Sequence, residues 1–290
     1  AGSYRPIRTR KVDFLSLPEF DYARTRILDD GWGYEYDRVV AYVKSPEMFV
    51  VFDIFKSRTD EYFTLANLWH TRKIYARGDH WYDTGYDVIG TSTFPDARRL
   101  LVLFPATHFR MEGVEPIKRH YQDELAIHQT TAHHFEQGHT EGFITVLVPH
   151  ASTEDPAALA SRVRLVETVP ARAGLAVTIE ADGRRITVAA KQDLRRDITY
   201  DYRRPRYTFE QGRIGYGPIV TDGDFLFAAQ EGDALSYTSV NMTRAQYGTQ
   251  VLFQTGQSYH GLQFDGTSDP GGIDKVRYWR DTVKVTPDGR

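Results

Sequence analysis

Residues 175–190 read LAVTIE, ADG and RRITVAA in succession, and this stretch carries the plainest structural signal in the chain. Both outer runs have strand length and are rich in β-branched residues. The Asp182-Gly183 pair between them readily adopts the positive φ angles of a tight hairpin turn. The stretch therefore predicts two antiparallel strands joined by a short turn.

Runs of the same kind recur on both sides of this hairpin, bounded by turn residues. They are RVVAYV at 38–43, MFVVFDIF at 48–55, YFTLANLW at 62–69, LLVLF at 100–104, FITVLV at 143–148, ITYDY at 198–202, RYTF at 206–209, FLFAA at 225–229, QVLFQ at 250–254 and KVRYW at 275–279. Many short strands at this spacing favour sandwiches over alternating strands and helices. We predict an all-β fold of two packed antiparallel β-sandwich units with few short helices.

One segment reads as a helix, and it also marks the best boundary between domains. Asp155 and Pro156 are suited to the start of a helix, and AALASRV follows at 157–163. A strand that ends at Pro149 precedes this polar stretch, and the hairpin region follows it. The expected division is into residues 1–155 and 156–290.

Composition limits the partners and the chemistry of the chain. Its 290 residues carry a formal net charge of −3 and contain no cysteine. A nearly neutral chain has no overall field that draws it to nucleic acid or to an anionic membrane, so neither partner is expected. The absence of cysteine excludes disulfides, thiolate metal sites and a cysteine nucleophile. The N-terminal residues lack the apolar segment of a signal peptide.

Histidine is concentrated in one part of the sequence. Six of the ten histidines lie between His108 and His139, which raises the odds of a metal site built from histidine and carboxylate. The chain has no HExxH and no HxH motif. The alternative is that each histidine faces solvent or bonds to the backbone. Asp83 and Asp87 lie four residues apart, so in one strand both would point to the same face.

The run from Tyr34 to His70 resembles the β-sandwich part of the heparinase II/III-like polysaccharide lyases. The similarity is carried by Arg38 before a strand, by the strand FVVFD that ends at Asp53, and by the strand end Leu68-Trp69-His70. The later FITVLVP at 143–149 is similar to a strand of the same region. The resemblance covers roughly residues 20–150.

The resemblance implies the β-sandwich portion of a lyase that cleaves an acidic, uronate-containing polysaccharide, a glycosaminoglycan or alginate, by β-elimination. It implies that an α/α toroid, in the same chain or a paired one, supplies most catalytic residues. It also implies a secreted or periplasmic location. Catalytic residues in this chain stay unassigned. The alternative is a non-catalytic β-sandwich that binds carbohydrate or supports another domain, and a weaker one is an independent metal-dependent enzyme.

The same resemblance implies a structural zinc ion held by two histidines and one aspartate. His70, Asp87 and His120 match these positions, with His128 as the alternative second histidine. Some family members carry a substrate-directed histidine two residues before the first ligand, where this chain has Leu68. The expected wall of the substrate cleft comprises Trp69, Arg72, Tyr75, His80 and Tyr82.

Overall fold

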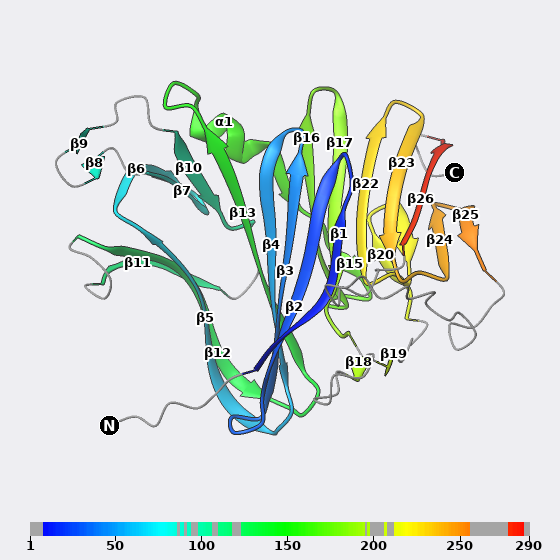
Figure 1. The fold of residues 1–290 in the computed structure, drawn as a ribbon, viewed down its shortest axis with the longest axis horizontal. Coiled ribbons are helices and arrows are strands. Elements are labelled where there is room, and N and C mark those ends of the chain that lie inside the picture. The colour runs from blue at the N-terminus through cyan, green and yellow to red at the C-terminus, as the bar shows by residue number, and fades with distance from the viewer. Residues whose placement is uncertain are drawn as a thin grey trace, which may run out of the picture.

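The computed structural model is built almost entirely of antiparallel strands, which confirms the all-β prediction (Figure 1). It describes residues 8–85, 88–89, 92–93, 98–105, 110–117, 123–194, 196–197, 206–207, 212–255 and 278–286. Among them, the one helix is α1 (Pro156–Ser161), which begins after Asp155, whose side chain accepts a hydrogen bond from the Ala157 N–H. The predicted helix is therefore confirmed as a short connector.

The largest sheet has eight strands in the order β1-β2-β3-β4-β13-β10-β7-β6. They are β1 (Arg8–Ser16), β2 (Phe20–Asp29), β3 (Tyr34–Lys44), β4 (Glu47–Ser57), β13 (Thr140–His150), β10 (Arg99–Leu103), β7 (Trp81–Gly85) and β6 (Lys73–Gly78). Apolar residues alternate along these strands. One set faces the second half of the chain, and the other set faces a smaller sheet.

The smaller sheet has three strands in the order β11-β12-β5. They are β11 (Met111–Pro116), β12 (Leu125–Phe135) and β5 (Glu61–Thr71). β5 follows β4 through a short connection, and β12 leads into β13 in the same way, so the chain crosses twice between the two sheets at one end of the first sandwich (Figure 1). Edge-to-face contacts of Phe55 with Phe63 and Phe135 close its interior near these turns.

The second half forms a six-stranded and a five-stranded sheet. The six-stranded sheet contains β14 (Val163–Leu165), β16 (Gly174–Ala181), β17 (Arg184–Lys191), β22 (Phe225–Glu231), β23 (Ala234–Val240) and β26 (Tyr278–Lys284). The five-stranded sheet contains β15 (Thr168–Val169), β20 (Ile214–Tyr216), β21 (Ile219–Thr221), β24 (Arg244–Tyr247) and β25 (Gln250–Gln254). Two separate pairs complete the described strands: β8 (Val88–Ile89) with β9 (Ser92–Thr93), and β18 (Arg196–Asp197) with β19 (Arg206–Tyr207).

The hairpin predicted around Asp182-Gly183 is confirmed as β16 and β17. Asp182 has φ of 52° and Gly183 has φ of 74°. Both values are positive, as the tight turn between twisted strands requires. The predicted strand at 198–202 lies outside the described residues, as do residues 208–209 of the strand predicted at 206–209 and residues 275–277 of the strand predicted at 275–279.

The four larger sheets stack in the order three-stranded, eight-stranded, six-stranded and five-stranded (Figure 1). The main core lies between the two middle sheets, where Phe20 stacks on Phe227 and Tyr22 stacks on Phe225. This core draws residues from both sides of Asp155. The division into domains at residue 155 stays a prediction.

Two buried arginines also join the halves of the chain. Arg24 and Arg26 on β2 both bind Asp37 on β3, with Nε to carboxylate oxygen distances of 2.7 and 2.5 Å. Each arginine also donates to a backbone carbonyl of the second half, Arg24 to Lys191 at 3.0 Å and Arg26 to Leu194 at 3.0 Å. Because all three side chains are buried, their mutual pairing replaces the water that each would otherwise need.

Candidate functional site

Asp53, the polar residue in the buried run at 48–55, fixes the three-stranded sheet against the eight-stranded sheet. Its carboxylate is 1% exposed. It accepts hydrogen bonds from Arg38 Nε at 2.6 Å, from the Tyr36 hydroxyl at 2.5 Å and from the amide of Asn67. Asn67 lies on β5, so this carboxylate ties one sheet to the other. Burial raises the pKa of the Tyr36 hydroxyl, and the charge of Asp53 raises it further, so Tyr36 stays a donor.

The surface of the three-stranded sheet that points away from the eight-stranded sheet is called here the outer face. Strand alternation places Tyr62, Leu68 and His70 of β5 on it, together with His128 and His134 of β12. Tyr62 is 68% exposed and Leu68 is 45% exposed. The outer face therefore carries three imidazoles beside exposed aromatic and apolar side chains.

His70 lies at the end of β5 and contacts a fully buried acid. Its Nδ1 is 2.8 Å from Oε1 of Glu124, whose side chain is 0% exposed. Glu124 precedes β12, and the pairing of His70 with Ala126 brings the two side chains together. A buried carboxylate on one ring nitrogen fixes the orientation of the imidazole.

His128 lies beside His70 on the next strand, directly opposite Leu68. Its ring covers Gly113 of β11, where an added Cβ would come within 2.8 Å of Nε2. Nε2 is also 3.7 Å from Oε1 of Glu115. Nδ1 is buried and has no hydrogen-bond partner in the described part of the chain. The imidazole of His128 is therefore held by packing against Gly113 and by the nearby charge of Glu115.

The residues expected to line a substrate wall lie in several different surroundings. Trp69 and Tyr82 belong to the small apolar cluster between the three-stranded and eight-stranded sheets, and Trp69 donates to Asn67 and Thr145. The guanidinium of Arg99 lies over the ring of Tyr75 on β6, with its central carbon 3.9 Å from the ring centroid of Tyr75. His80, with φ of 61°, contacts Glu112 at 2.6 Å.

Arg72, the remaining residue of that set, is half-buried between β5 and β6. The assignment of these five side chains to a substrate wall stays a prediction.

The expected metal ligands are only in part within the described structure. Asp87 and His120 lie outside the described residues, whereas His70 and the alternative His128 lie two residues apart across the β5-β12 pair. Within the described residues no group of three or more His, Cys, Asp or Glu side chains could hold a metal ion. The zinc site stays a prediction.

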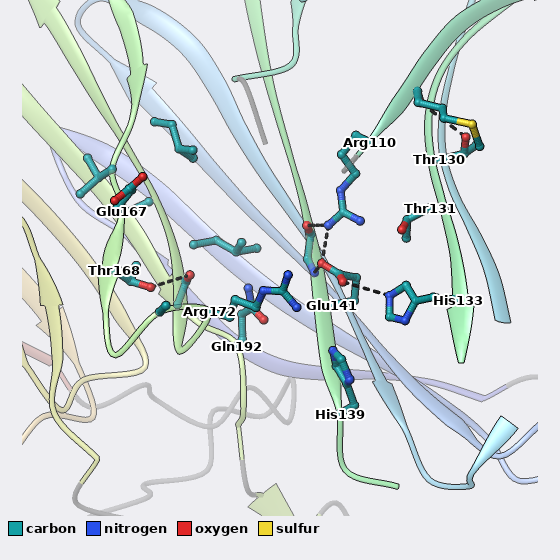
Figure 2. A pocket seen from close by; sticks show the side chains of 18 of the residues that line it. Arg110, Thr130, Thr131, His133, His139, Glu141, Glu167, Thr168, Arg172 and Gln192 are labelled. Carbon is teal, nitrogen blue, oxygen red and sulfur yellow. Dashed lines mark hydrogen bonds and ion pairs between the residues drawn. The ribbon is translucent and has the colours of Figure 1, made fainter. Parts of the chain in front are cut away.

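Sequence reasoning missed a second feature, a cavity of about 910 Å³ beside β13. β10 pairs only with residues 146–150 of β13, so the first part of that strand has an open edge within the described residues. Arg110 covers this edge and donates to the Gly142 carbonyl at 2.6 Å and to Glu141. Figure 2 shows Arg172 reaching toward Glu141 from the opposite wall.

Glu141 lies at the centre of the polar lining of this cavity (Figure 2). Burial works to raise the pKa of its carboxyl, but the charge and hydrogen bond of Arg110, the Gly142 N–H and the charge of Arg172 hold that pKa below its ordinary value. Glu141 therefore stays ionised at neutral pH. His133 lies beside it, with Nε2 3.4 Å from Oε2. These residues are distant in sequence and form no motif, so only the strand pairing reveals them.

Comparison with known proteins gives distant structural likenesses alone. No protein-family model matches the chain, and no curated protein matches it. The heparan sulfate lyase HepC from Pedobacter heparinus is similar with a TM-score of 0.46 and 13% identity, over 64% of this chain and 28% of that chain. A heparinase III, the BT4657 gene product, is similar with a TM-score of 0.44 and 12% identity, over 63% of this chain and 27% of that chain. This chain therefore spans little more than a quarter of the length of either protein.

No helix in the described ranges combines the length and apolar character needed to cross a membrane.

Proposed function

We propose that this chain is the β-sandwich portion of a lyase that cleaves an acidic, uronate-containing polysaccharide by β-elimination. The outer face forms one wall of the substrate cleft in this proposal. The observation that carries it is the placement of His70, about one-third exposed, and the less exposed His128 on neighbouring strands of the outer face, each beside a carboxylate. Uronate is favoured as the substrate because the ring proton beside its carboxylate is acidic. An imidazole can act as the base that removes this proton.

β-Elimination makes three demands of the protein. A base removes the proton beside the sugar carboxylate, the bond from the neighbouring ring carbon to the glycosidic oxygen breaks with formation of a carbon–carbon double bond, and an acid protonates the departing oxygen. The sugar carboxylate must also be neutralised, so that negative charge can develop on the ring. We assign one proton transfer to Nε2 of His128, which lies 3.7 Å from Glu115, because Nδ1 is buried and has no hydrogen-bond partner within the described residues.

The other groups come from an α/α toroid, in the same chain or a paired one, that closes over the outer face. The substrate class, a glycosaminoglycan or alginate, and a periplasmic or secreted location belong to the same proposal. The test is eliminative cleavage by the complete gene product that contains this chain, followed by the ultraviolet absorbance of the unsaturated product. The 290-residue chain alone is expected to give no such absorbance.

A structural zinc ion at the end of β5 is part of the proposal, with His70, Asp87 and His120 as ligands. The fit of His70 is supported by Glu124, because metal-binding histidines commonly give their second ring nitrogen to a carboxylate. Nδ1 is bonded to that carboxylate, so Nε2 is the atom that would face the metal. When bound, a zinc ion with protein ligands alone would stabilise the strand end rather than act on substrate.

We expect metal analysis of the purified chain to find about one zinc ion per molecule, as a closed structural site implies. His70→Ala should lose that zinc and melt at a lower temperature, because binding energy of a structural metal is folding energy. His134→Ala, which alters another histidine of the outer face, is the matched control and should keep the zinc. Full zinc content in His70→Ala would contradict the assignment of this ligand.

A further inference from the structure

The cavity beside β13 is lined by two residues that each hold a buried polar atom with no hydrogen-bond partner within the described residues. One is the side-chain oxygen of Gln192, a residue that is 5% exposed. The other is the Nε of Arg110. A buried polar atom without a partner has lost its hydrogen bonds to water and gained none in return, so native proteins rarely leave one unpaired without a reason. A ligand in the cavity could supply the missing partner for Gln192.

Charge in the cavity is arranged asymmetrically around Glu141. Arg110 contacts the Glu141 carboxylate directly, so these two charges balance each other. Arg172 comes from the opposite wall, is exposed, and makes no hydrogen bond or ion pair within the described residues. Its φ of +63° is a backbone conformation that non-glycine residues seldom adopt. The arrangement presents an unpaired guanidinium near an ionised carboxylate.

The cavity also has an apolar wall that closes tightly on β13. Leu175 and Gln192 pack against Gly142, where an added Cβ would lie 2.5 Å from Leu175 Cδ1 and 3.0 Å from Gln192 Nε2. Both residues line the cavity together with Val166 and Ala176. The space is therefore bounded by apolar carbon on one side and by polar groups on the other, as small-molecule sites commonly are.

We infer that this cavity binds one sugar unit that carries a carboxylate, a hexuronate, at a site separate from the outer face. Arg172 would hold the sugar carboxylate, because a guanidinium matches the two oxygens of a planar carboxylate. Glu141 would accept hydrogen bonds from ring hydroxyls, and Gln192 would pair with another. The apolar wall would face the C–H surface of the ring. His70 and His128 are not among the residues that line this cavity.

The experiment measures binding of sodium glucuronate to the 290-residue chain by calorimetry, with glucose and glucose 6-sulfate as comparison ligands. Arg172→Asn should weaken glucuronate binding about tenfold or more, because a hydrogen bond to a charged group is lost. Asparagine tolerates the positive φ at this position, so the turn should be kept. Arg162→Asn is the matched control, since Arg162 is exposed and does not line the cavity, and it should bind glucuronate as the parent does.

Gln192→Leu provides a second variant that removes the amide and keeps most of the volume. It should fold with an unchanged or higher melting temperature and bind glucuronate more weakly. Equal binding of glucose or glucose 6-sulfate, no binding of glucuronate, or unchanged binding in both cavity variants would overturn the inference. Eliminative cleavage by the complete gene product does not depend on this result, so the two proposals can fail separately.

Discussion

Asp37→Ala is expected to lower the free energy of unfolding by about 3–5 kcal/mol, the usual cost of removing one partner from a buried ion pair. The variant leaves Arg24, which is 0% exposed, and Arg26, which is 4% exposed, without their shared carboxylate. Both arginines also support the carbonyls of Lys191 and Leu194, so the junction between the two halves should loosen as well. Urea unfolding followed by tryptophan fluorescence measures the change.

Asp21→Ala is the matched control for this variant. Asp21 lies on β2, the strand that pairs with the β3 strand of Asp37, but its ion pair with Lys44 is about one-third exposed, and such pairs contribute about 0–1 kcal/mol. A loss below about 1 kcal/mol in Asp37→Ala would contradict the role given to the buried triad.

The carboxylate of Asp37 should also make the free energy of unfolding depend on pH in the acid range. Burial works to raise the pKa of Asp37, but Arg24 and Arg26 overcome this effect and hold the pKa below its ordinary value of 3.8. A depressed pKa means that the stabilisation is present above 3.8 and is lost as pH falls toward the lower folded-state value. The gap in unfolding free energy between the parent and Asp37→Asn should therefore narrow below about pH 3.8. If the difference in unfolding free energy between the parent and Asp37→Asn stays constant down to strongly acid pH, the lowered pKa of Asp37 is contradicted.

Asp53→Ala is expected to have the second large effect on stability, a loss of about 3 kcal/mol or more. Its carboxylate gathers donors from Tyr36, Arg38 and Asn67, and the variant leaves the buried amide of Asn67 short of a partner. Because Asn67 belongs to β5, we expect faster amide hydrogen exchange along that strand in the variant. Urea unfolding and hydrogen exchange followed by mass spectrometry provide the two measurements.

Asp30→Ala, which removes an exposed ion pair with Arg58, controls for the loss of a carboxylate and should change neither measurement appreciably. If β5 keeps its protection in Asp53→Ala, the carboxylate does not hold the three-stranded sheet in place.

Local sequence predicted those parts of the fold that local chemistry decides. Asp182-Gly183 predicted a turn because both residues tolerate positive φ, and Asp155-Pro156 predicted the start of α1. Asp53 was visible as the polar interruption of a buried run, but its partner Asn67 was not. Periodicity indicates which residues share a face of a strand, and it does not indicate which strand lies opposite.

The candidate sites depend on such pairings and so could be predicted only in part. The family resemblance pointed to His70 and offered His128 as an alternative ligand, but the placement of Glu124 and His128 beside His70 follows from the register of β5 with β12, more than 50 residues along the chain. The cavity was missed altogether, because Arg110, Glu141 and Arg172 come from three separate segments. Charged residues scattered in this way look like ordinary surface residues in the sequence.

The rate of eliminative cleavage by the complete gene product, with and without His128→Ala, tests the proposed wall most directly. The readout is the ultraviolet absorbance of the unsaturated product from glycosaminoglycans, alginate and other uronate polymers. We expect cleavage of at least one polymer, a rate about 100-fold or more lower in His128→Ala because a proton transfer is impaired, and a nearly unchanged rate in His134→Ala. Absence of cleavage on all such polymers, or an unchanged rate in His128→Ala, would contradict the assignment of the outer face to a lyase active site.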